Sequence, residues 1–415
     1  MSATGANSAA GPPRVLLLIP ARTYRATGFL TAASRMGLDL VVGSDGALPL
    51  GGHPVVHVSA RDVPGSVGRI LACGERFGAV VAADTPMLVL AAIIAERMGL
   101  PHNRVDAVSA ATDKAEQRRR WAAASVAQPA FRIVPPGASE DSLRRAASGF
   151  PCVVKAVSLG ASQGILRADG PGAVVTAARR IRRILATAGR PADEPLLVEE
   201  YVPGPELSID GLLTGGDLAV TALFDKPCAP GGPTFEETVL TTPSWLPGPV
   251  QATAIATAGR AARALGLTHG PIHAELRIGQ RDGRPWPVML ELAARSIGGL
   301  CSRTLRFADG RSLEELVLAN ALGRPVPRPR TARPAGVLMI PVPRHGILRA
   351  VEGRSDATAT PGITGMTITI PAGQRVQPLP DGDRYLGFIF AEGDTCDEVE
   401  KSLGTAREQL RIMIE

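Results

Sequence analysis

Lysine and aromatic residues are scarce in this chain of 415 residues. Only four of its 45 basic residues are lysines, and aromatic residues make up 4% of the sequence. Nucleic-acid bases stack on aromatic side chains, so this scarcity argues against a nucleic-acid partner in spite of the net charge of +6. The densest basic cluster, Arg179 to Arg183, has helical spacing and is interpreted as a solvated helix face rather than a phosphate-binding patch.

Long apolar runs and paired cysteine motifs are also absent. No run approaches the roughly 18 apolar residues that a membrane-spanning helix needs, so we expect no membrane partner. The five cysteines are scattered without a CxxC pair, which indicates reduced, mostly buried thiols. Residues 1–13 are small and polar with no basic-then-apolar signal pattern, and we interpret them as a disordered tail on a cytoplasmic protein.

The remaining sequence divides into three regions of different pattern. Between residues 14 and 110, short apolar runs alternate with helical stretches, which is typical of an α/β domain with a parallel sheet. Residues 111–325 have an α+β pattern with a substantial antiparallel share. A proline-rich joint at 324–334 marks a boundary, after which residues 326–415 are predicted to form a small α+β domain. We expect this last domain to end in an amphipathic helix over 395–415.

The strongest chemical signal is a pair of strands with alternating charged residues. They are HAELR at 273–277 and VMLELAAR at 288–295, joined by a segment whose Asp-Gly pair is typical of a hairpin turn. Counting outward from Gly283 places Glu275 opposite Glu291, allowing for a bulge. Directly opposed residues have Cβ atoms about 5 Å apart. The sequence therefore predicts two adjacent carboxylates on one face of the hairpin.

Two carboxylates this close repel each other unless a cation lies between them. Mg²⁺, which prefers oxygen ligands and commonly bridges to substrate phosphates, is the natural occupant of a site formed by Glu275 and Glu291. Arg295 lies on the same face and would neutralise charge on a transferring phosphoryl group. The alternative interpretation is a solvated hairpin with mixed charges.

A second signal combines a lysine with a loop of small residues. Lys155 ends an apolar strand, and the loop over 158–164 follows it. Backbone amides in such a loop can cradle phosphate oxygens, and a compact ammonium group fits among them. The loop is not a Walker A motif, and a plain surface turn is the alternative. The candidate residues of the loop are Ser158, Gly160, Ser162 and Gly164.

A third signal is LLVEEYVPGPELSIDG, at 196–211. An apolar strand runs into Glu199, Glu200, Tyr201 and Val202 and then turns at a Pro-Gly-Pro sequence. Backbone exposed at a strand end can pair with an adenine edge, and Glu206 could accept hydrogen bonds from ribose hydroxyls. A strand and tight turn with exposed acids is an equally good interpretation.

The order of these parts, from Lys114 to Arg295, resembles the ATP-grasp superfamily. Within it, the ELAARSIGG stretch at 291–299 and LGFIFAEGDTCDEVEKSL at 386–403 look most like the L-amino acid ligases and related carboxylate–amine ligases. The resemblance implies an ATP-grasp fold with an N-terminal parallel-sheet (pre-ATP-grasp) domain and a small C-terminal α+β domain. It also implies ATP and Mg²⁺ as cofactors, with Mn²⁺ as an alternative ion.

The resemblance assigns roles to the candidate residues. Lys114 and Lys155 would contact ATP phosphates, and the 158–164 loop would close over them. Glu206 would bind ribose, and Lys226 would lie near the γ-phosphate or the substrate. Glu199, Glu200 and Val202 would hold adenine, the last two by backbone groups, and Tyr201 would belong to the same cofactor-binding set. Glu275 and Glu291 would ligate the metal, and Arg295 would steady phosphoryl transfer and the acyl phosphate.

Two features depart from the common superfamily pattern. Ala293 stands where most ATP-grasp enzymes have an asparagine that ligates a second metal ion, a change that amino acid ligases often share. The Ser296-Ile297-Gly298-Gly299 sequence stands where biotin carboxylases usually have Ile-Gln-Val-Glu-His, which counts against carboxylation. Gly298 and Gly299 would let backbone amides approach the oxyanion of a tetrahedral intermediate.

The predicted reaction joins two small molecules, a carboxylate and an amine, into an amide or peptide bond through an acyl phosphate. Residues 231–242 are the candidate for substrate selection, where Glu236 and Glu237 could hold an ammonium group or be surface acids. Arg303 and Arg306 could grip a carboxylate or form helix-face salt bridges. The alternatives are a biotin-carboxylase-like enzyme and a nucleotide-binding protein without catalysis. A homodimer is the default assembly.

Overall fold

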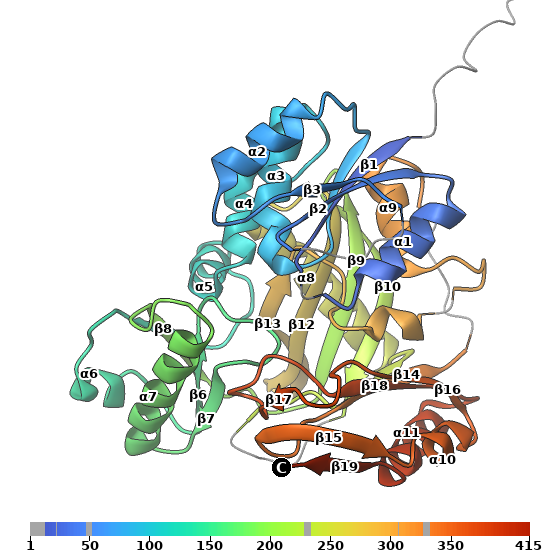
Figure 1. The fold of residues 1–415 in the computed structure, drawn as a ribbon. Helices are drawn as coiled ribbons and strands as arrows, with labels where there is room; N and C mark the ends of the chain where they lie inside the picture. Colours follow the sequence, from blue (N-terminus) through green and yellow to red (C-terminus); the bar gives the residue numbers. More distant parts are fainter. Residues whose placement is uncertain (1–12, 22, 47–51, 228–233, 306, 327–332) are drawn as a thin grey trace, which may run out of the picture.

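The computed structural model describes residues 13–415, except for positions 22, 47–51, 228–233, 306 and 327–332 (Figure 1). The predicted tail, apart from Pro13, lies outside the described residues, as do Cys228, Arg306 and most of the proline-rich joint. No helix in the described part of the chain is long and apolar enough to cross a lipid bilayer. The four cysteines it includes are free, but only Cys152 and Cys301 are buried, so the prediction of mostly buried thiols was too broad.

The N-terminal region forms a parallel sheet in the order β3-β2-β1-β4. Its strands are β1 (Arg14–Ile19), β2 (Asp39–Ser44), β3 (Val55–His57) and β4 (Ala79–Ala82). Five consecutive residues of β1, from Val15 to Ile19, are fully buried, because both faces of the sheet are covered. The neighbouring helices are α1 (Ala26–Arg35), α2 (Val63–Ala72), the short η1 (Thr85–Met87), α3 (Leu88–Arg97) and α4 (Val105–Ala111). This confirms the predicted parallel-sheet region.

An eight-stranded sheet forms the centre of the molecule, in the order β13-β12-β9-β10-β11-β14-β18-β16. Its first five strands in the chain are β9 (Glu206–Thr214), β10 (Asp217–Lys226), β11 (Val239–Thr242), β12 (Gly270–Arg281) and β13 (Arg284–Ala293). The others are β14 (Ala335–Ile340), β16 (Ile363–Ile368) and β18 (Gly387–Glu392). The helices α5 (Lys114–Ala123) and α8 (Gly248–Leu265) pack near it, and η2 (Cys301–Thr304) and α9 (Leu313–Ala321) follow β13.

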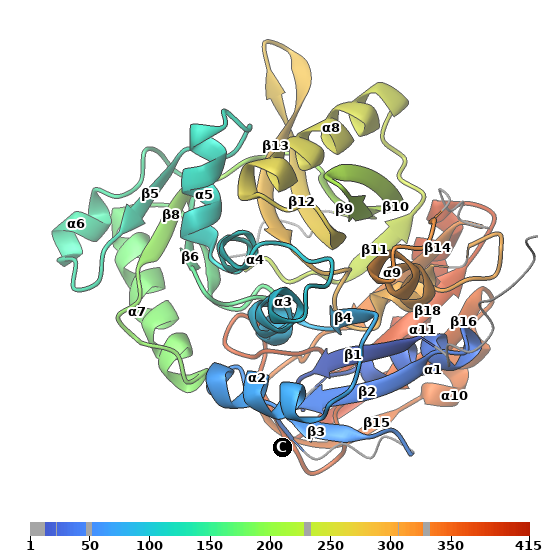
Figure 2. The same ribbon diagram turned by 90° about the horizontal axis from the view of Figure 1, so that it is seen from above.

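A smaller four-stranded sheet stands apart from the centre, as the green lobe in Figures 1 and 2. Its strands, in the order β5-β8-β6-β7, are β5 (Phe131–Val134), β8 (Leu196–Glu200), β6 (Cys152–Ala156) and β7 (Ile165–Ala168). The helices α6 (Glu140–Arg144) and α7 (Pro171–Thr187) cover it. In α7, Ile181 is fully buried while Arg179 is exposed, in agreement with a solvated helix face. We call this lobe, residues 131–200, the small lobe.

The C-terminal residues add a three-stranded sheet of β15 (Gly346–Glu352), β17 (Arg375–Val376) and β19 (Arg411–Ile414), with helices α10 (Arg354–Ala359) and α11 (Cys396–Glu408). The expected helix over 395–415 was wrong in its last turns. The helix ends at Glu408, and β19 instead pairs antiparallel with β15. The sequence of β19 is RIMI, and its β-branched isoleucines favour a strand over a further helical turn. In the strand, Ile414 is buried.

Candidate functional site

One face of the central sheet carries the polar side chains of β9 and β12. Strand residues two apart point to the same face, so Glu206, Ser208 and Asp210 of β9 share this face. Each lies directly opposite a charged or titratable residue of β12. The opposed pairs are Glu206 with Arg277, Ser208 with Glu275, and Asp210 with His273. The register of two strands therefore assembles most of the site.

The hairpin of β12 and β13 brings the two predicted metal ligands together. Glu275 pairs directly with Glu291, and a register irregularity follows between Glu275 and Leu276. The turn residues Asp282 and Gly283 have φ angles of 51° and 73°, the left-handed conformation that a tight hairpin turn requires. The predicted turn and the pairing of Glu275 with Glu291 are confirmed, with one bulge in the register.

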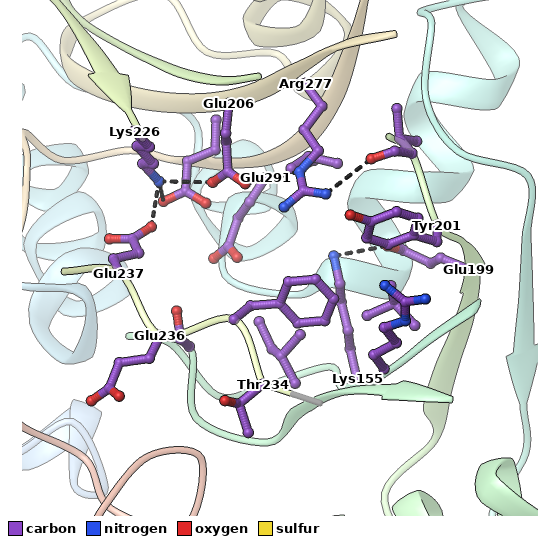
Figure 3. A pocket seen from close by; sticks show the side chains of 18 of the residues that line it. Lys155, Glu199, Tyr201, Glu206, Lys226, Thr234, Glu236, Glu237, Arg277 and Glu291 are labelled. Atoms are coloured by element: carbon purple, nitrogen blue, oxygen red, sulfur yellow. Dashed lines mark hydrogen bonds and ion pairs between the residues drawn. The ribbon is translucent and has the colours of Figure 1, made fainter. Parts of the chain in front are cut away.

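Lys226, at the end of β10, lies at the centre of three carboxylates (Figure 3). Its Nζ is 3.1 Å from Glu206 and 3.2 Å from Glu275, and it also contacts Glu237. Burial alone would lower the pKa of Lys226, but the three carboxylates raise it above its usual value. The ammonium group therefore stays charged and compensates most of the acidic charge around it.

His273 connects the same cluster to the segment that follows β13. Its Nδ1 lies 3.0 Å from Asp210 and its Nε2 lies 3.3 Å from Glu275. Although burial opposes protonation, the two carboxylates raise the pKa of His273 to about 9. The other oxygen of Asp210 accepts a hydrogen bond of 2.7 Å from the backbone N–H of Ile297. Asp210 was not among the predicted site residues, because only the β9–β12 register reveals its position.

Lys155 and Glu199 form a buried ion pair in the small lobe. Lys155 Nζ is 2.8 Å from Glu199, and Arg118 Nε donates to the other oxygen at 2.5 Å. Burial alone would raise the pKa of Glu199, but the Arg118 and Lys155 charges lower it to about 2. Glu199 is 2% exposed, so its carboxylate anchors two cations, and contact with adenine would have to come from its backbone. Sequence reasoning missed Arg118, which is far from the motif in the chain.

Lys114 links the second predicted metal ligand to the glycine-rich loop. Its Nζ is 3.1 Å from Glu291 and donates a hydrogen bond of 2.5 Å to the carbonyl of Leu159. Lys114 begins α5, and Asp113 caps that helix by accepting from the backbone N–H of Glu116. The cap thus fixes the start of the helix that presents Lys114 to the site.

A single cavity collects most of the predicted binding residues and leaves about 1050 Å³ of unfilled space, its open mouth included. Its lining includes ten of them: Lys155, Ser162, Glu199, Glu200, Tyr201, Val202, Glu206, Lys226, Glu275 and Glu291. The lining does not include Lys114, Ser158, Gly160, Gly164, Arg295, Gly298 or Gly299. The cavity lies between the small lobe and the central sheet (Figure 3).

Aromatic rings and guanidinium groups line one end of this cavity. Arg277 donates hydrogen bonds of 3.0 Å to Glu206 and to the carbonyl of Val202. Its guanidinium lies 5.1 Å from the centre of the Tyr201 ring and 5.7 Å from that of Phe235. These contacts hold the strand end with Glu200, Tyr201 and Val202 at the cavity wall. Phe235 and Arg277 were not singled out from the sequence.

Arg295 points away from the cavity lining, toward the N-terminal region. Its Nε donates to Thr85 Oγ1 at 3.0 Å, and its Nη1 donates to the carbonyl of Ser296 at 2.9 Å. A Cβ atom on Gly299 would lie 2.8 Å from the Phe388 ring, and φ at Gly299 is 59°, so only glycine fits. The segment that carries Arg295 and the two glycines is therefore held tightly beside the site.

The two candidate groups for substrate recognition lie in different places. Glu236 and Glu237 line the cavity, and burial raises the pKa of Glu236. Arg303 lies on η2, where it donates to Thr367 at 3.0 Å and covers the Phe390 ring at 4.8 Å. Arg303 is not part of the cavity lining.

The chemistry of the carboxylates fits a magnesium ion. Oxygen atoms of Glu206, Glu237 and Glu275 lie within 4.8 Å of one another, and Lys226 places a compact cation among them. Glu291, the other predicted ligand, is not in this group of three and contacts the ammonium group of Lys114. Carboxylate oxygens are the ligands that Mg²⁺ prefers. In this structure the compact ammonium groups of lysines supply the positive charge beside them.

Two family models match the chain. The model of the ATP-grasp domain matches residues 148–304, and that of the L-amino acid ligase C-terminal domain 2 matches residues 338–415. Carnosine synthase 1 of Gallus gallus is 33% identical over 168 residues, which are 38% of this chain and 17% of the synthase. The chain therefore spans less than a fifth of that relative's length.

Two further proteins are similar over most of the chain. An uncharacterized protein, y4rH, of Sinorhizobium fredii is 23% identical over 360 residues, covering 86% of this chain and 73% of that protein. The crystal structure of an L-amino acid ligase from Bacillus licheniformis superimposes with a TM-score of 0.79 at 23% identity, covering 98% of this chain and 100% of that one. Residues 148–304 therefore form an ATP-grasp domain, and residues 338–415 form a domain of the kind found at the C-terminus of L-amino acid ligases.

Proposed function

We propose that this protein is an ATP-dependent ligase that joins a carboxylate to an amine through an acyl phosphate and releases ADP. The observation that carries the proposal is the hairpin pairing of Glu275 with Glu291, beside a cavity that also holds Lys155 and Lys226. Opposed carboxylates and nearby ammonium groups form a site that suits a metal-bound polyphosphate.

The cavity offers a separate place for each part of ATP. The strand end with Glu200 and Val202 would present backbone groups to adenine, and Glu206 would bind the ribose. Lys155 and Ser162, which line the cavity, would contact the phosphates, together with Lys114, which pairs with Glu291 beside it. These assignments support catalysis by positioning and charge neutralisation, which dominate phosphoryl transfer.

Glu275 and Glu291 would hold Mg²⁺, or Mn²⁺ in its place. When bound, this ion neutralises charge on the phosphate oxygens. Lys226 contacts Glu275 in the present structure, so its ammonium group occupies space close to this metal site. Lys226 is well placed to contact a transferring phosphoryl group, once the carboxylates are shared with the ion.

The acyl and amine partners would meet on the side of the cavity that faces the Arg295–Gly299 segment. The substrate carboxylate attacks the γ-phosphorus in line, ADP leaves, and the amine then displaces phosphate from the acyl phosphate. Arg295 and the backbone amides of Gly298 and Gly299 would stabilise the oxyanion, which requires Arg295 to leave its hydrogen bond with Thr85. Glu237 and Glu236 supply negative charge that suits the ammonium group of an amino acid or small peptide.

The comparisons favour this function over its alternatives. Both the C-terminal domain model and the structure with a TM-score of 0.79 come from L-amino acid ligases. Biotin carboxylases share the fold, with a TM-score of 0.69 for the enzyme from Campylobacter jejuni, but at 16% identity. The homodimer and the cytoplasmic location stay predictions.

The test is a screen for phosphate release from Mg²⁺ and ATP over pairs of amino acids and dipeptides, followed by mass spectrometry of the products. We expect release that requires both a carboxylate and an amine, with one new amide bond per ADP. Release that needs bicarbonate and no amine would instead identify a carboxylase. ATP binding without turnover on any pair would leave only a nucleotide-binding protein.

A further inference from the structure

A turn of the C-terminal region touches the glycine-rich loop of the small lobe. The turn spans residues 378–383, between β17 and β18. The carbonyl of Pro380 accepts a hydrogen bond of 3.1 Å from the backbone N–H of Gly164. The carbonyl of Asp381 accepts one of 3.2 Å from the side-chain amide of Gln163. Two consecutive residues of the loop are thus bonded to two consecutive residues of the turn.

The same turn also binds the helix that covers the small lobe. The Asp381 carboxylate accepts from Arg180 of α7, with Nε 3.2 Å from each oxygen and a further contact through Nη2. This two-point geometry is the strong form of an arginine–carboxylate pair. The Arg180 and Asp381 side chains are 38% and 28% exposed, so the pair can be altered without opening a core. Asp381 therefore ties the C-terminal region to the loop and to the lobe at once.

The loop itself is held in a conformation that it would not adopt unaided. Ala161 and Ser162 have φ angles of 54° and 58°, in the left-handed region that costs a side-chain-bearing residue about 1 kcal/mol or more. Such a conformation persists only where neighbouring contacts impose it. At its start the loop is held by Glu194, which accepts hydrogen bonds from Ser158, and by Lys114, which donates to the carbonyl of Leu159. At its end it is held by the 378–383 turn.

We propose that Asp381 is a positioning residue for the phosphate-binding loop, and that the 378–383 turn acts as a tether that keeps this loop over the nucleotide phosphates. The inference rests on the proposed function only in taking the cavity to be the ATP site. The tether gives the C-terminal domain a part in nucleotide binding, although none of its described residues belongs to the cavity lining. Loosening the loop weakens nucleotide binding and lets water reach the acyl phosphate.

The experiment compares the full-length protein with the variants Asp381→Asn, Arg180→Ala and the charge exchange Arg180→Asp/Asp381→Arg. Calorimetry measures the Kd for ADP in the presence of Mg²⁺, and a coupled assay measures the ratio of ADP to amide formed. We expect each single variant to raise the Kd about fivefold, the upper range for a partly exposed ion pair, and to raise the ADP-to-amide ratio. The charge exchange should recover most of both losses.

Arg179→Ala is the matched control. Arg179 is the neighbour of Arg180 on α7 and forms an ion pair with Glu140, whereas the pair with the turn belongs to Arg180. The Kd of the Arg179→Ala variant for ADP should equal that of the unaltered protein. Thermal melting should show that all variants fold. Unchanged Kd values in the Asp381 and Arg180 variants, or no recovery on charge exchange, would overturn the proposal.

The outcomes also separate this inference from the proposed function. If the unaltered protein binds ADP and forms amides but the variants behave like it, the tether is wrong and the ligase stands. If no amide forms with any substrate yet the variants weaken ADP binding, the tether stands and the ligase assignment falls. If the unaltered protein binds no nucleotide, both proposals are overturned.

Discussion

Each acidic side chain at the centre of the site has a cationic partner. Glu275 and Glu206 share Lys226, Glu199 holds Lys155 and Arg118, and the carboxylate of Glu291 meets Lys114. Burying a charge without such a partner costs several kcal/mol, so the pairs are needed before any ligand binds. The same pairs also leave the site close to neutral, which lets a nucleotide with its metal ion enter without large repulsion.

The first prediction concerns the metal ligands. Glu291→Gln should abolish ATP turnover, because the amide supplies no negative charge to the ion, while the fold stays intact. The Glu291 side chain is 27% exposed, so water can solvate Lys114 after the change. Phosphate release measures turnover, and circular dichroism with thermal melting measures folding. Glu352→Gln, an exposed position on β15, is the control and should keep full activity. Near-normal phosphate release by Glu291→Gln would contradict the metal assignment.

A second prediction follows from the low pKa of Glu199. Its pKa is about 2 in the folded protein against 4.5 for the free group, which corresponds to about 3 kcal/mol of stability. A carboxyl group whose pKa falls on folding contributes this stability fully at pH values above 4.5. The contribution is lost as the pH falls through the window from 4.5 to about 2. The protein should therefore lose stability in this acidic range.

Urea unfolding of the unaltered protein and of Glu199→Gln, repeated at several pH values, tests this claim. The variant should be less stable by several kcal/mol at pH 7, because Arg118 and Lys155 lose their buried counter-charge. The difference between the two proteins should shrink as the pH falls below about 4.5. A difference that stays constant down to pH 3 would show that Glu199 does not have the low pKa.

At the scale of single elements, the β12–β13 hairpin shows what the sequence could predict. Its register follows from local information, since alternation sets the face and Asp282-Gly283 sets the turn. The partners of Lys226 could not be read in the same way, because Glu237 reaches it from the segment before β11. The last strand, β19, was also missed, since its pairing with β15 brings together residues far apart in the chain.

A third prediction is that the turn of this hairpin affects the stability of the protein and not its catalysis. Gly283→Ala should lower stability by about 1 kcal/mol, because φ at this position is 73° and alanine is strained there. A Cβ atom at Gly283 would meet no atom within 4 Å, so strain of the backbone is the whole effect. The turn lies at the end of the hairpin away from Glu275, so kcat should not change. Chemical unfolding and steady-state kinetics measure the two quantities.

Gly68 provides a control of opposite sign. It lies within α2, where an added Cβ atom would meet no described atom within 4 Å, and its φ is not in the left-handed region. Gly68→Ala should therefore stabilise the protein, since alanine loses less backbone entropy in a helix. If both alanine variants shift stability in the same direction, the left-handed turn is not the reason for the glycine at 283.

At the scale of the whole molecule, the central sheet crosses the predicted boundary between residues 325 and 326. β14, β18 and β16 follow that boundary in the chain but extend the sheet that begins with β9 and β10. The Phe388 ring of β18 packs against Gly299 and lies 5.8 Å from the Tyr24 ring of the N-terminal region. The sequence could predict the order of the regions and their element types, but pairings over such distances in the chain depend on the complete fold.

The last prediction concerns a nucleotide that contacts both the small lobe and the central sheet. A nucleotide in the cavity touches the small lobe through Lys155 and Ser162 and the central sheet through Glu275 and Glu291. ADP with Mg²⁺ at 100 times its Kd should stabilise the folded protein by about 2.7 kcal/mol. With an unfolding entropy of about 2.1 cal/mol/K per residue over 415 residues, this raises Tm by about 3 °C.

Removal of Mg²⁺ with EDTA should abolish most of this increase, because ADP phosphates then meet the Glu275 and Glu291 carboxylates without a cation between them. Calorimetry should show the small lobe and the rest of the chain shifting together, since the ligand spans both and the 378–383 turn joins them. A shift confined to one of two transitions would mean that the nucleotide binds to one side of the cavity only. An equal shift with EDTA would mean that the carboxylates of the hairpin do not act through a metal ion.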